Sequence, residues 1–500
     1  MLYRKTASLC PVCKKIIPAT IFEKEGKVMI KKECKEHGVF EDVYWGNVNL
    51  YLRAEKWMVN GEGVKNPKYP IVNGCPFDCG LCDLHKTPTL LANIDITNRC
   101  NLQCPICFAN ANTAGYVYEL SYKQVVAMLR LLRENEPKPY AVQFSGGEPT
   151  IHPEFLKMVS IARKMGFSQV QVATNGIKLA EKGYAQKLLD AGLHTVYLQF
   201  DGIDERVYKI ARGKNLFEIK KKAIEECRNT KPKPLSTVLV PTIVNTINDD
   251  QIGKIFRFAV ENIDVIRGIN FQPVSFSGRI EEEDRIKQRF TIPDLAEKLE
   301  KETDGLIKKE DWYPVPCVIP LFDLASAIDK KTRAEFTIHP HCGMATYVFV
   351  RGNEIIPITK FIDVDAFLED AKNIAENVKQ SKFAKIRGIT KAMRLLKYID
   401  EKEMPEGMNV KDLIKEIIGK RDRSSLAKFH WQSLYIGAMH FQDLYNYDIQ
   451  RVMRCGVHYV TPDGRIIPFC AYNTGPCYRE EVEKRFSISL DEWREKHGKA

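Results

Sequence analysis

The chain has no long hydrophobic run. Its most apolar stretches, such as Val315–Leu324, are interrupted by proline or charge well before the roughly 18 residues that a membrane-spanning helix requires. The first residues also contain no apolar segment of the kind found in a secretory signal. We therefore expect a cytoplasmic protein in a reducing compartment. If it contacts a membrane, we expect it to bind peripherally.

The chain also lacks blocks of charge of one sign. Lys and Arg number 75 against 64 Asp and Glu, which gives a net charge of +11, but these charges are spread along the sequence. Aromatic and basic residues do not interleave as they do on an RNA-recognition sheet. The surplus of positive charge permits contact with anionic lipid headgroups. No nucleic-acid partner is expected.

Cysteine is abundant by contrast, with 15 residues. In a reducing compartment, clustered cysteines are typical of metal ligands rather than disulfides. The first group consists of Cys10-Pro-Val-Cys13 and Cys34-Lys-Glu-His37, two knuckles whose four side chains suit one tetrahedral ion. We expect residues 1–60 to form a small module around one mononuclear Zn or rubredoxin-like Fe.

Two further groups share the spacing C-x3-C-x2-C. One is Cys75, Cys79 and Cys82 in the segment 61–89, and the other is Cys100, Cys104 and Cys107. This spacing lets one tight loop place three thiolates at three corners of a [4Fe–4S] cube. Each group therefore predicts an iron–sulfur cluster.

Residues 90–285 alternate predicted strands with amphipathic helices, of which one opens with a capping box at Ser121 and Gln124. The expected strands are Leu90–Thr97, Tyr140–Phe144, Gln169–Thr174, Thr195–Phe200, Ser236–Ile243 and Gly268–Val274. This alternation predicts an α/β fold, an open partial (β/α)6 barrel. Its functional residues should lie at the ends of the strands.

A C-x3-C-x2-C loop after the first strand and Gly146-Gly147-Glu148 after the second resemble the radical S-adenosylmethionine (SAM) enzymes. The resemblance implies that Cys100, Cys104 and Cys107 hold three irons of a catalytic [4Fe–4S] cluster, while the fourth iron binds SAM. It also implies that Gly146 and Gly147 let the backbone approach the methionine moiety, with Glu148 near its ammonium. Further candidates for contact with SAM or substrate are Phe108, Asn175, Gln199, Asp201 and Gln272. Asn175, Gln199, Asp201 and Gln272 could instead cap strands and helices.

Residues 286–500 contain the remaining candidate ligands, which are Cys317, Cys342, Cys455, Cys470 and Cys477. The segments that follow Cys342 and Cys455 have similar patterns, which predicts two hairpins resembling the C-terminal cluster-binding extension of the superfamily. Together with Cys75, Cys79 and Cys82 these cysteines provide eight thiolates. That number suits two auxiliary [4Fe–4S] clusters, three clusters in all; an incompletely ligated auxiliary cluster with one free cysteine is the alternative.

The order of these motifs along the whole chain is similar to that of the archaeal tetraether lipid synthases. This resemblance implies an enzyme that joins terminal sp3 carbons of isoprenoid lipid chains, supplied with electrons by a low-potential donor such as a ferredoxin. A basic amphipathic segment at Ser381–Arg423 could then rest on a membrane, and Trp431–Phe441 could line an apolar tunnel.

Two alternatives remain open. Related radical SAM proteins are assigned to methylation of 7,8-dihydro-6-hydroxymethylpterin in methanopterin biosynthesis. An iron–sulfur electron carrier or RNA-contacting protein is the alternative of a different class, which the Gly-Gly-Glu motif and the βα alternation disfavour.

The catalytic cluster provides a test. Replacing Cys100, Cys104 and Cys107 together by alanine should abolish the formation of 5′-deoxyadenosine from SAM, because the iron that binds SAM is lost. Chromatography of the products and the iron content would measure the two effects. A triple variant that still forms 5′-deoxyadenosine would move the catalytic cluster to Cys75, Cys79 and Cys82.

Overall fold

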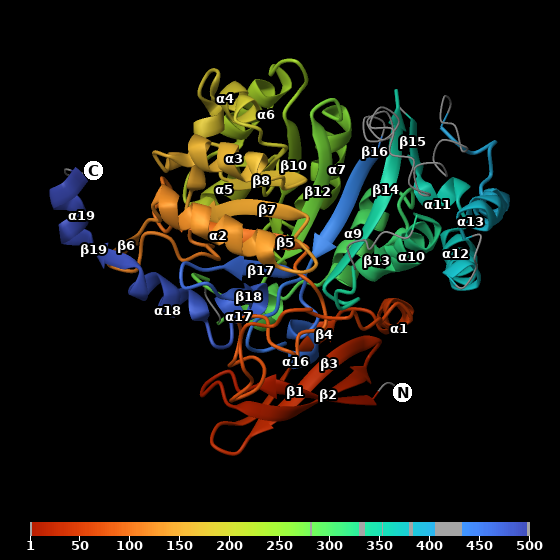
Figure 1. Ribbon diagram of the computed structural model, residues 1–500, viewed down its shortest axis with the longest axis horizontal. Coiled ribbons are helices and arrows are strands. Elements are labelled where there is room, and N and C mark those ends of the chain that lie inside the picture. The colour runs from red at the N-terminus through yellow and green to blue at the C-terminus, as the bar shows by residue number, and fades with distance from the viewer. Residues whose placement is uncertain are drawn as a thin grey trace.

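A computed structural model describes residues 3–280, 283–329, 336–352, 354–379, 384–405 and 433–497. Figure 1 shows a small all-β module at the N-terminus beneath a large α/β body, with a group of helices at one side of that body. The chain therefore has the mixed α/β architecture that the sequence predicts.

The N-terminal module is a four-stranded antiparallel sheet in the order β1-β2-β3-β4. Its strands are β1 (Tyr3–Leu9), β2 (Ile16–Lys24), β3 (Lys27–Cys34) and β4 (Gly38–Trp45). Alternate residues of β3 are buried, as expected for a sheet with one solvated face. Helix α1 (Val48–Glu55) follows the module and leads to the segment that contains Cys75, Cys79 and Cys82.

The body is built on a parallel sheet in the order β5-β7-β8-β9-β10-β12. The strands are β5 (Leu91–Thr97), β7 (Ala141–Gly146), β8 (Gln169–Thr174), β9 (Thr195–Gln199), β10 (Ser236–Val240) and β12 (Ile266–Pro273). These strands agree with the prediction to within two or three residues at each end. The exception is Pro241, which lacks an N–H and separates β10 from β11 (Thr242–Ile243).

Helices pack outside this sheet, as a partial barrel requires. They include α2 (Tyr122–Glu134), α3 (Phe155–Lys164), α4 (Tyr184–Asp190), α5 (Glu205–Arg212), α6 (Phe217–Arg228), α7 (Ile252–Glu261) and α9 (Ile292–Glu302). The predicted capping box is present at the start of α2, where Ser121 and Gln124 hydrogen-bond reciprocally.

The C-terminal segment extends the barrel sheet at both edges (Figure 1). At one edge β16 (Ser433–Met439) pairs with β12, and the hairpin of β14 (Gly343–Arg351) and β15 (Glu354–Pro357) pairs with β16. At the other edge the hairpin of β17 (Val457–Val460) and β18 (Ile466–Pro468) pairs with β5. The two predicted Cys-led hairpins are therefore confirmed, and they flank the sheet of the body.

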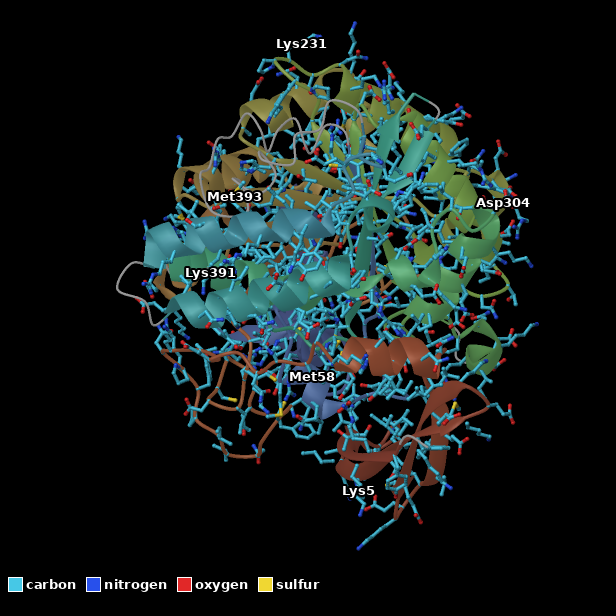
Figure 2. The ribbon with its side chains drawn as sticks, turned by 90° about the vertical axis from the view of Figure 1, so that its right-hand side faces the viewer. Lys5, Met58, Lys231, Asp304, Lys391 and Met393 are labelled. Carbon is cyan, nitrogen blue, oxygen red and sulfur yellow. The ribbon has the colours of Figure 1, made fainter. Side chains whose placement is uncertain are left out.

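A second hydrophobic core lies beside the barrel, among α10 (Ile319–Asp329), α12 (Val364–Lys379) and α13 (Ala384–Ala392). Figure 2 views these helices from the side, with Lys391 marking α13 and Met58 marking the chain after α1. Of the predicted basic segment Ser381–Arg423, residues 381–383 and 406–423 lie outside the described residues. The described part packs Ala392 and Leu395 into this core.

The C-terminal end returns to the barrel. Helices α17 (Phe469–Asn473) and α18 (Tyr478–Arg485) lead to strand β19 (Ser487–Ser489), which pairs with β6 (Tyr116–Tyr118), and to helix α19 (Leu490–His497). Of the predicted tunnel-lining stretch Trp431–Phe441, residues 433–439 form strand β16, residues 440–441 follow it, and residues 431–432 lie outside the described residues. In the described part of the chain, no helix is long and apolar enough to cross a membrane.

Buried ion pairs join the N-terminal module to the body. The Arg289 guanidinium donates to Asp42 of β4 at 3.0 Å and to Asp443 at 3.1 Å, and all three side chains are almost completely buried. Asp443 also accepts a hydrogen bond from the backbone N–H of Phe276. The Arg289 guanidinium therefore lies between two buried carboxylates at the junction, and Arg285 also pairs with Asp42.

Removing this guanidinium should destabilise the protein strongly. Arg289→Met leaves Asp42 and Asp443 with less compensation in a buried site, so we expect the free energy of unfolding to fall by about 3–5 kcal/mol. Lys24→Met is the matched control, because Lys24 pairs with Glu41 at an exposed site, where such a pair contributes at most about 1 kcal/mol. Equal effects in thermal or denaturant unfolding would contradict this assignment.

Candidate functional site

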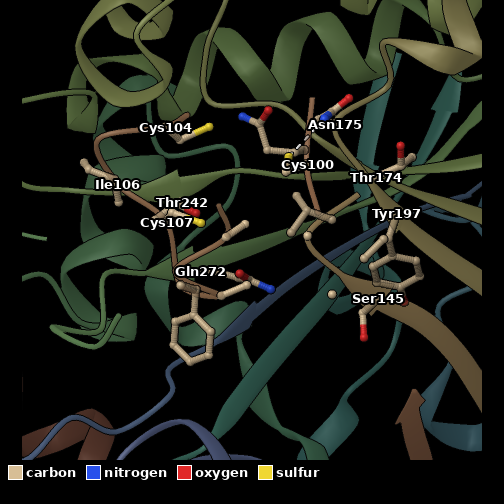
Figure 3. Close-up of a pocket in the computed structure, with 18 of the residues that line it drawn as sticks. Cys100, Cys104, Ile106, Cys107, Ser145, Thr174, Asn175, Tyr197, Thr242 and Gln272 are labelled. Atoms are coloured by element: carbon tan, nitrogen blue, oxygen red, sulfur yellow. Dashed lines mark hydrogen bonds between the residues drawn. The ribbon is translucent and has the colours of Figure 1, made fainter. Parts of the chain in front are cut away.

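A cavity of about 290 Å³ lies at the carboxyl ends of the parallel strands (Figure 3). Of the side chains that the sequence singles out, it brings together Cys100, Cys104, Cys107, Phe108, Gly146, Gly147, Asn175, Gln199 and Gln272. Glu148 and Asp201 are not part of its lining and are fully buried behind it.

The loop that contains the three cysteines is fixed by side chains from elsewhere in the chain. Asn112 accepts a hydrogen bond from the backbone N–H of Cys100 at 3.0 Å and donates to its carbonyl at 2.8 Å. Arg279, which follows β12, donates to the Cys104 carbonyl at 2.7 Å and exchanges two backbone hydrogen bonds with Cys107. The protein's own hydrogen bonds thus hold the three thiols at the carboxyl ends of the barrel strands.

The chemistry of these thiols fits a cluster rather than a single ion. Among the described residues only one group of ligand atoms is close enough for a single ion, and it lies in the N-terminal module. Burial raises the pKa of Cys100 to about 12 and raises that of Cys104. Such thiols lose their protons when a positively charged metal centre binds them, so the three side chains suit three corners of a [4Fe–4S] cube.

Gly146 and Gly147 are required by the chain's own backbone. A side chain at Gly146, whose φ is +125°, would clash with the Thr97 carbonyl, and one at Gly147 would clash with the Arg99 carbonyl. The N–H of Gly147 donates to Thr97 at 2.7 Å. The glycines therefore let the turn after β7 dock under the start of the cysteine loop, although both also line the cavity.

Glu148 is engaged by its own surroundings. Its carboxylate accepts hydrogen bonds from the Thr150 N–H at 3.1 Å, the Thr174 hydroxyl at 2.8 Å and the Asn175 N–H at 2.8 Å. Burial raises its pKa, which these hydrogen bonds oppose. Glu148 thus ties the ends of β7 and β8 together, and its predicted place near the SAM ammonium stays a prediction.

Asp201 is likewise occupied by Arg212. The Arg212 guanidinium donates to the two carboxylate oxygens at 2.6 and 2.8 Å and to the Ile106 carbonyl, inside the cysteine loop, at 2.7 Å. Asp201 therefore forms a buried ion pair with Arg212, and its predicted contact with SAM or substrate stays a prediction. This pair ties the end of β9 to the loop.

Lys220 of α6 is buried behind Gln199 and Asn175. Its ammonium donates to the Gln199 carboxamide oxygen at 2.7 Å and to the Asn175 carbonyl. Burial lowers the pKa of Lys220 to about 7 in spite of the nearby Asp201 carboxylate. Lys220 therefore orients the Gln199 side chain and holds the Asn175 backbone, without lining the cavity itself.

The remaining cysteines gather below the barrel. Charge interactions with the thiols of Cys75, Cys82 and Cys455 help to raise the pKa of Cys79. Those with the thiols of Cys470 and Cys342 help to raise the pKa of Cys455. Burial is the main reason why the pKa of Cys79 and of Cys455 is raised. Six cysteines from three separate segments therefore face a common region, with Cys455 between the two sets.

Unpaired polar groups surround the same region. The Arg451 guanidinium donates to the Cys342 sulfur at 3.3 Å, and the Gln442 N–H donates to the Cys470 sulfur at 3.4 Å. Nη1 of Arg451, Nε2 of Gln442 and both ring nitrogens of His440 are buried without a partner in the described residues. Buried donors rarely stay unpaired, so they fit the sulfur atoms of an auxiliary cluster.

Cys317 lies elsewhere. Cys317 is packed in the second core, where its thiol is influenced by Asp365 and Arg53 and by no other described cysteine. Cys477 directly precedes Tyr478, whose hydroxyl donates to the Phe77 carbonyl, between Cys75 and Cys79, at 2.6 Å. Cys317 is therefore separated from the other auxiliary cysteines, and two fully ligated auxiliary clusters stay a prediction.

The N-terminal module holds a compact ligand set. The ligand atoms of Cys10, Cys13, Cys34 and His37 all lie within 4.8 Å of one another. His37 Nδ1 lies 3.4 Å from the Cys34 sulfur, and this contact holds the pKa of Cys34 below its usual value. The donor set fits one tetrahedral Zn or Fe ion.

Comparison with known proteins agrees with this geometry. The radical SAM superfamily model matches residues 94–259, and the model of the HMPTM N-terminal zinc ribbon domain matches residues 2–46. A protein of Methanocaldococcus jannaschii, named 7,8-dihydro-6-hydroxymethylpterin dimethyltransferase, is 51% identical over 499 residues, which is 99% of this chain and 97% of that protein. The chain belongs to the radical SAM superfamily and to the family of this relative.

Other similarities to this radical SAM protein are partial. A probable GTP 3′,8-cyclase of Methanococcus aeolicus is 28% identical over 228 residues, which cover 44% of this chain and 70% of that protein. The crystal structure of Streptococcus suis SuiB covers 44% of this chain and 47% of SuiB at 19% identity, with a TM-score of 0.35.

The predicted lipid-coupling function is wrong. The relative that matches nearly the whole chain is named for a pterin, and nothing in the comparisons supports the whole-chain resemblance to tetraether lipid synthases. The motifs behind that prediction are cysteine spacings and Gly-Gly-Glu. These residues bind or position cofactors, so they do not define the substrate of a radical SAM protein.

Several residues of this radical SAM site escaped the sequence analysis. Arg212, Lys220 and Arg279 are basic residues in helices or loops, where such residues are usually solvated. Their burial was the missing information, because Lys220 is fully buried and Arg212 is 9% exposed.

The role of Lys220 can be tested in this radical SAM protein. Lys220→Met leaves the Gln199 oxygen and the Asn175 carbonyl without their donor, so we expect SAM to bind about tenfold more weakly, or ~1.4 kcal/mol. Lys221→Met is the matched control, because Lys221 is exposed and pairs with Glu218. Equilibrium binding of SAM to the reconstituted protein measures both, and equal affinities would rule out the positioning role.

Proposed function

We propose that this protein is a radical SAM methyltransferase that acts on a reduced pterin, 7,8-dihydro-6-hydroxymethylpterin. The observation that carries the proposal is the 51% identity to the dimethyltransferase of M. jannaschii across 99% of this chain. The match spans the N-terminal module and the C-terminal region, whereas the cyclase match covers 44% of the chain.

In this proposal Cys100, Cys104 and Cys107 hold the catalytic cluster, and Phe108, Asn175, Gln199 and Gln272 contact SAM or substrate. When bound, the reduced cluster and SAM supply one-electron cleavage of SAM and hydrogen abstraction from an unactivated C–H bond. The protein's own part is to hold the cysteine loop through Asn112, Arg212 and Arg279 and to exclude water from the cavity.

Further cofactors and partners belong to the same proposal. Cys75, Cys79, Cys82, Cys342, Cys455 and Cys470 provide ligands for auxiliary iron–sulfur binding, with Cys455 shared between the two sets by position. The N-terminal site binds one Zn or Fe through Cys10, Cys13, Cys34 and His37. A low-potential donor such as a ferredoxin supplies the electrons.

The activity can be measured directly. Incubation of the reduced, reconstituted protein with SAM and 7,8-dihydro-6-hydroxymethylpterin should produce pterins heavier by one and two methyl groups. SAM is the methyl donor in this incubation, so one S-adenosylhomocysteine should form for each methyl group transferred, beside the 5′-deoxyadenosine and methionine of reductive cleavage. The Cys100→Ala variant is the control and should form neither methylated pterin nor 5′-deoxyadenosine. Formation of 5′-deoxyadenosine without any methylated pterin would show that the substrate is a different one.

A further inference from the structure

Three tyrosines lie on one row across the barrel sheet. The strand pairing aligns Ala173, Tyr197, Val238, Gly268, Tyr435 and Tyr347 as successive neighbours on β8, β9, β10, β12, β16 and β14. Neighbouring residues in register point to the same face of a sheet. Because Tyr197 lines the cavity, the other members of the row also face the barrel interior.

The strands make room for these rings. Small residues stand beside them, because Ala173 neighbours Tyr197 and Gly268 neighbours Tyr435. The Tyr435 hydroxyl lies over Gly437, where any side chain would clash with it. Gly437 is two residues closer to the end of the sheet where the cavity lies, so the Tyr435 ring leans toward the cavity.

The three side chains are close together, and Tyr197 is the one that lines the cavity. The rings of Tyr347 and Tyr435 pack edge to face with centroids 5.4 Å apart. Tyr197 is close enough to both phenols to raise their pKa values. All three retain intermediate exposure, although they lie inside the sheet. Their strand neighbours, such as Val196 and Leu434, are fully buried on the other face.

Their hydroxyls have no hydrogen-bond partner among the described residues. Burial raises the pKa of Tyr347 to about 12 and raises that of Tyr197 and Tyr435, so all three stay protonated at neutral pH. No Lys or Arg is among the groups that shift these pKa values. The row therefore offers aromatic faces and neutral hydroxyls that both donate and accept.

Figure 3 places Tyr197 beside Ser145 on the side of the cavity away from Cys104. Ser145 and Asp95 add no free charge, because the Asp95 carboxylate accepts from the Ser145 hydroxyl at 2.6 Å and from Arg479 at 2.6 Å. We infer that Tyr197, Tyr347 and Tyr435 form the subsite that binds the ring of an uncharged, planar heteroaromatic substrate. This inference rests on the proposed function for the identity of that substrate, a dihydropterin.

The chemistry of the subsite explains this choice. Aromatic side chains contact a flat ring with large area, and phenolic hydroxyls match the alternating donors and acceptors of a fused pyrimidine. A phosphorylated substrate would need cationic partners, which this row lacks. The subsite thus favours a pterin without phosphate over a nucleoside triphosphate.

Binding to the reconstituted, SAM-loaded protein tests the subsite. Tyr197→Phe and Tyr435→Phe keep the ring and remove one hydroxyl, so each should weaken binding of 7,8-dihydro-6-hydroxymethylpterin about tenfold. Tyr197→Leu also removes the ring and should weaken it by roughly a hundredfold. SAM affinity should stay unchanged in all variants, which also shows that they fold. Tyr140→Phe is the matched control, because Tyr140 is 54% exposed at the start of β7.

The outcomes separate the subsite from the proposed function. Pterin binding that is unaffected by all three tyrosine variants would overturn the subsite and leave the function standing. If the wild-type protein binds guanosine or another neutral heterocycle but no pterin, with the same dependence on the tyrosines, the subsite stands and the proposed substrate is wrong. Preferential binding of GTP, or binding of no planar heterocycle, would overturn the inference.

Discussion

The site depends on the hydrogen bonds that anchor the Cys100–Cys107 loop. Asn112 holds its beginning, Arg212 bonds the Ile106 carbonyl, and Arg279 holds its end from the far side of the barrel sheet. A loop with three thiols pays a conformational-entropy cost on ordering, and charge-assisted hydrogen bonds to its carbonyls offset this cost. The Gly-Gly-Glu turn docks under the same loop, so the ends of β5, β7, β9 and β12 converge on it.

The continuous sheet explains how the cysteines of distant segments meet. Hairpin β14–β15 is joined to one edge of the barrel through β16, and hairpin β17–β18 is joined to the other edge through β5. Cys342 and Cys455 stand just before the first strands of these hairpins. Backbone hydrogen bonds from Lys86 to Met453 and from Leu90 to Gly456 hold Cys455 beside the end of the segment that contains Cys75, Cys79 and Cys82.

The proposed function assigns cofactor chemistry and substrate choice to different layers of the barrel. The thiols, Asn175, Gln199 and Gln272 lie at the strand ends, whereas the tyrosine row lies one layer deeper. Cysteine spacing alone described the upper layer, which is why it could suggest a lipid as readily as a pterin. The deeper layer carries hydroxyls and aromatic faces, which suit a flat polar ring.

The sequence by itself determined the strands of the barrel, the capping box of α2, the two hairpins and the ligand set of the N-terminal module, because spacing and periodicity are local properties. Tertiary structure alone decided that Glu148 and Asp201 are held by Thr174 and Arg212, and that Lys220 is buried. It also placed Cys317 in a separate core and aligned Tyr197, Tyr347 and Tyr435. These features depend on which strands become neighbours, and strand order and burial cannot be read from spacing along the chain.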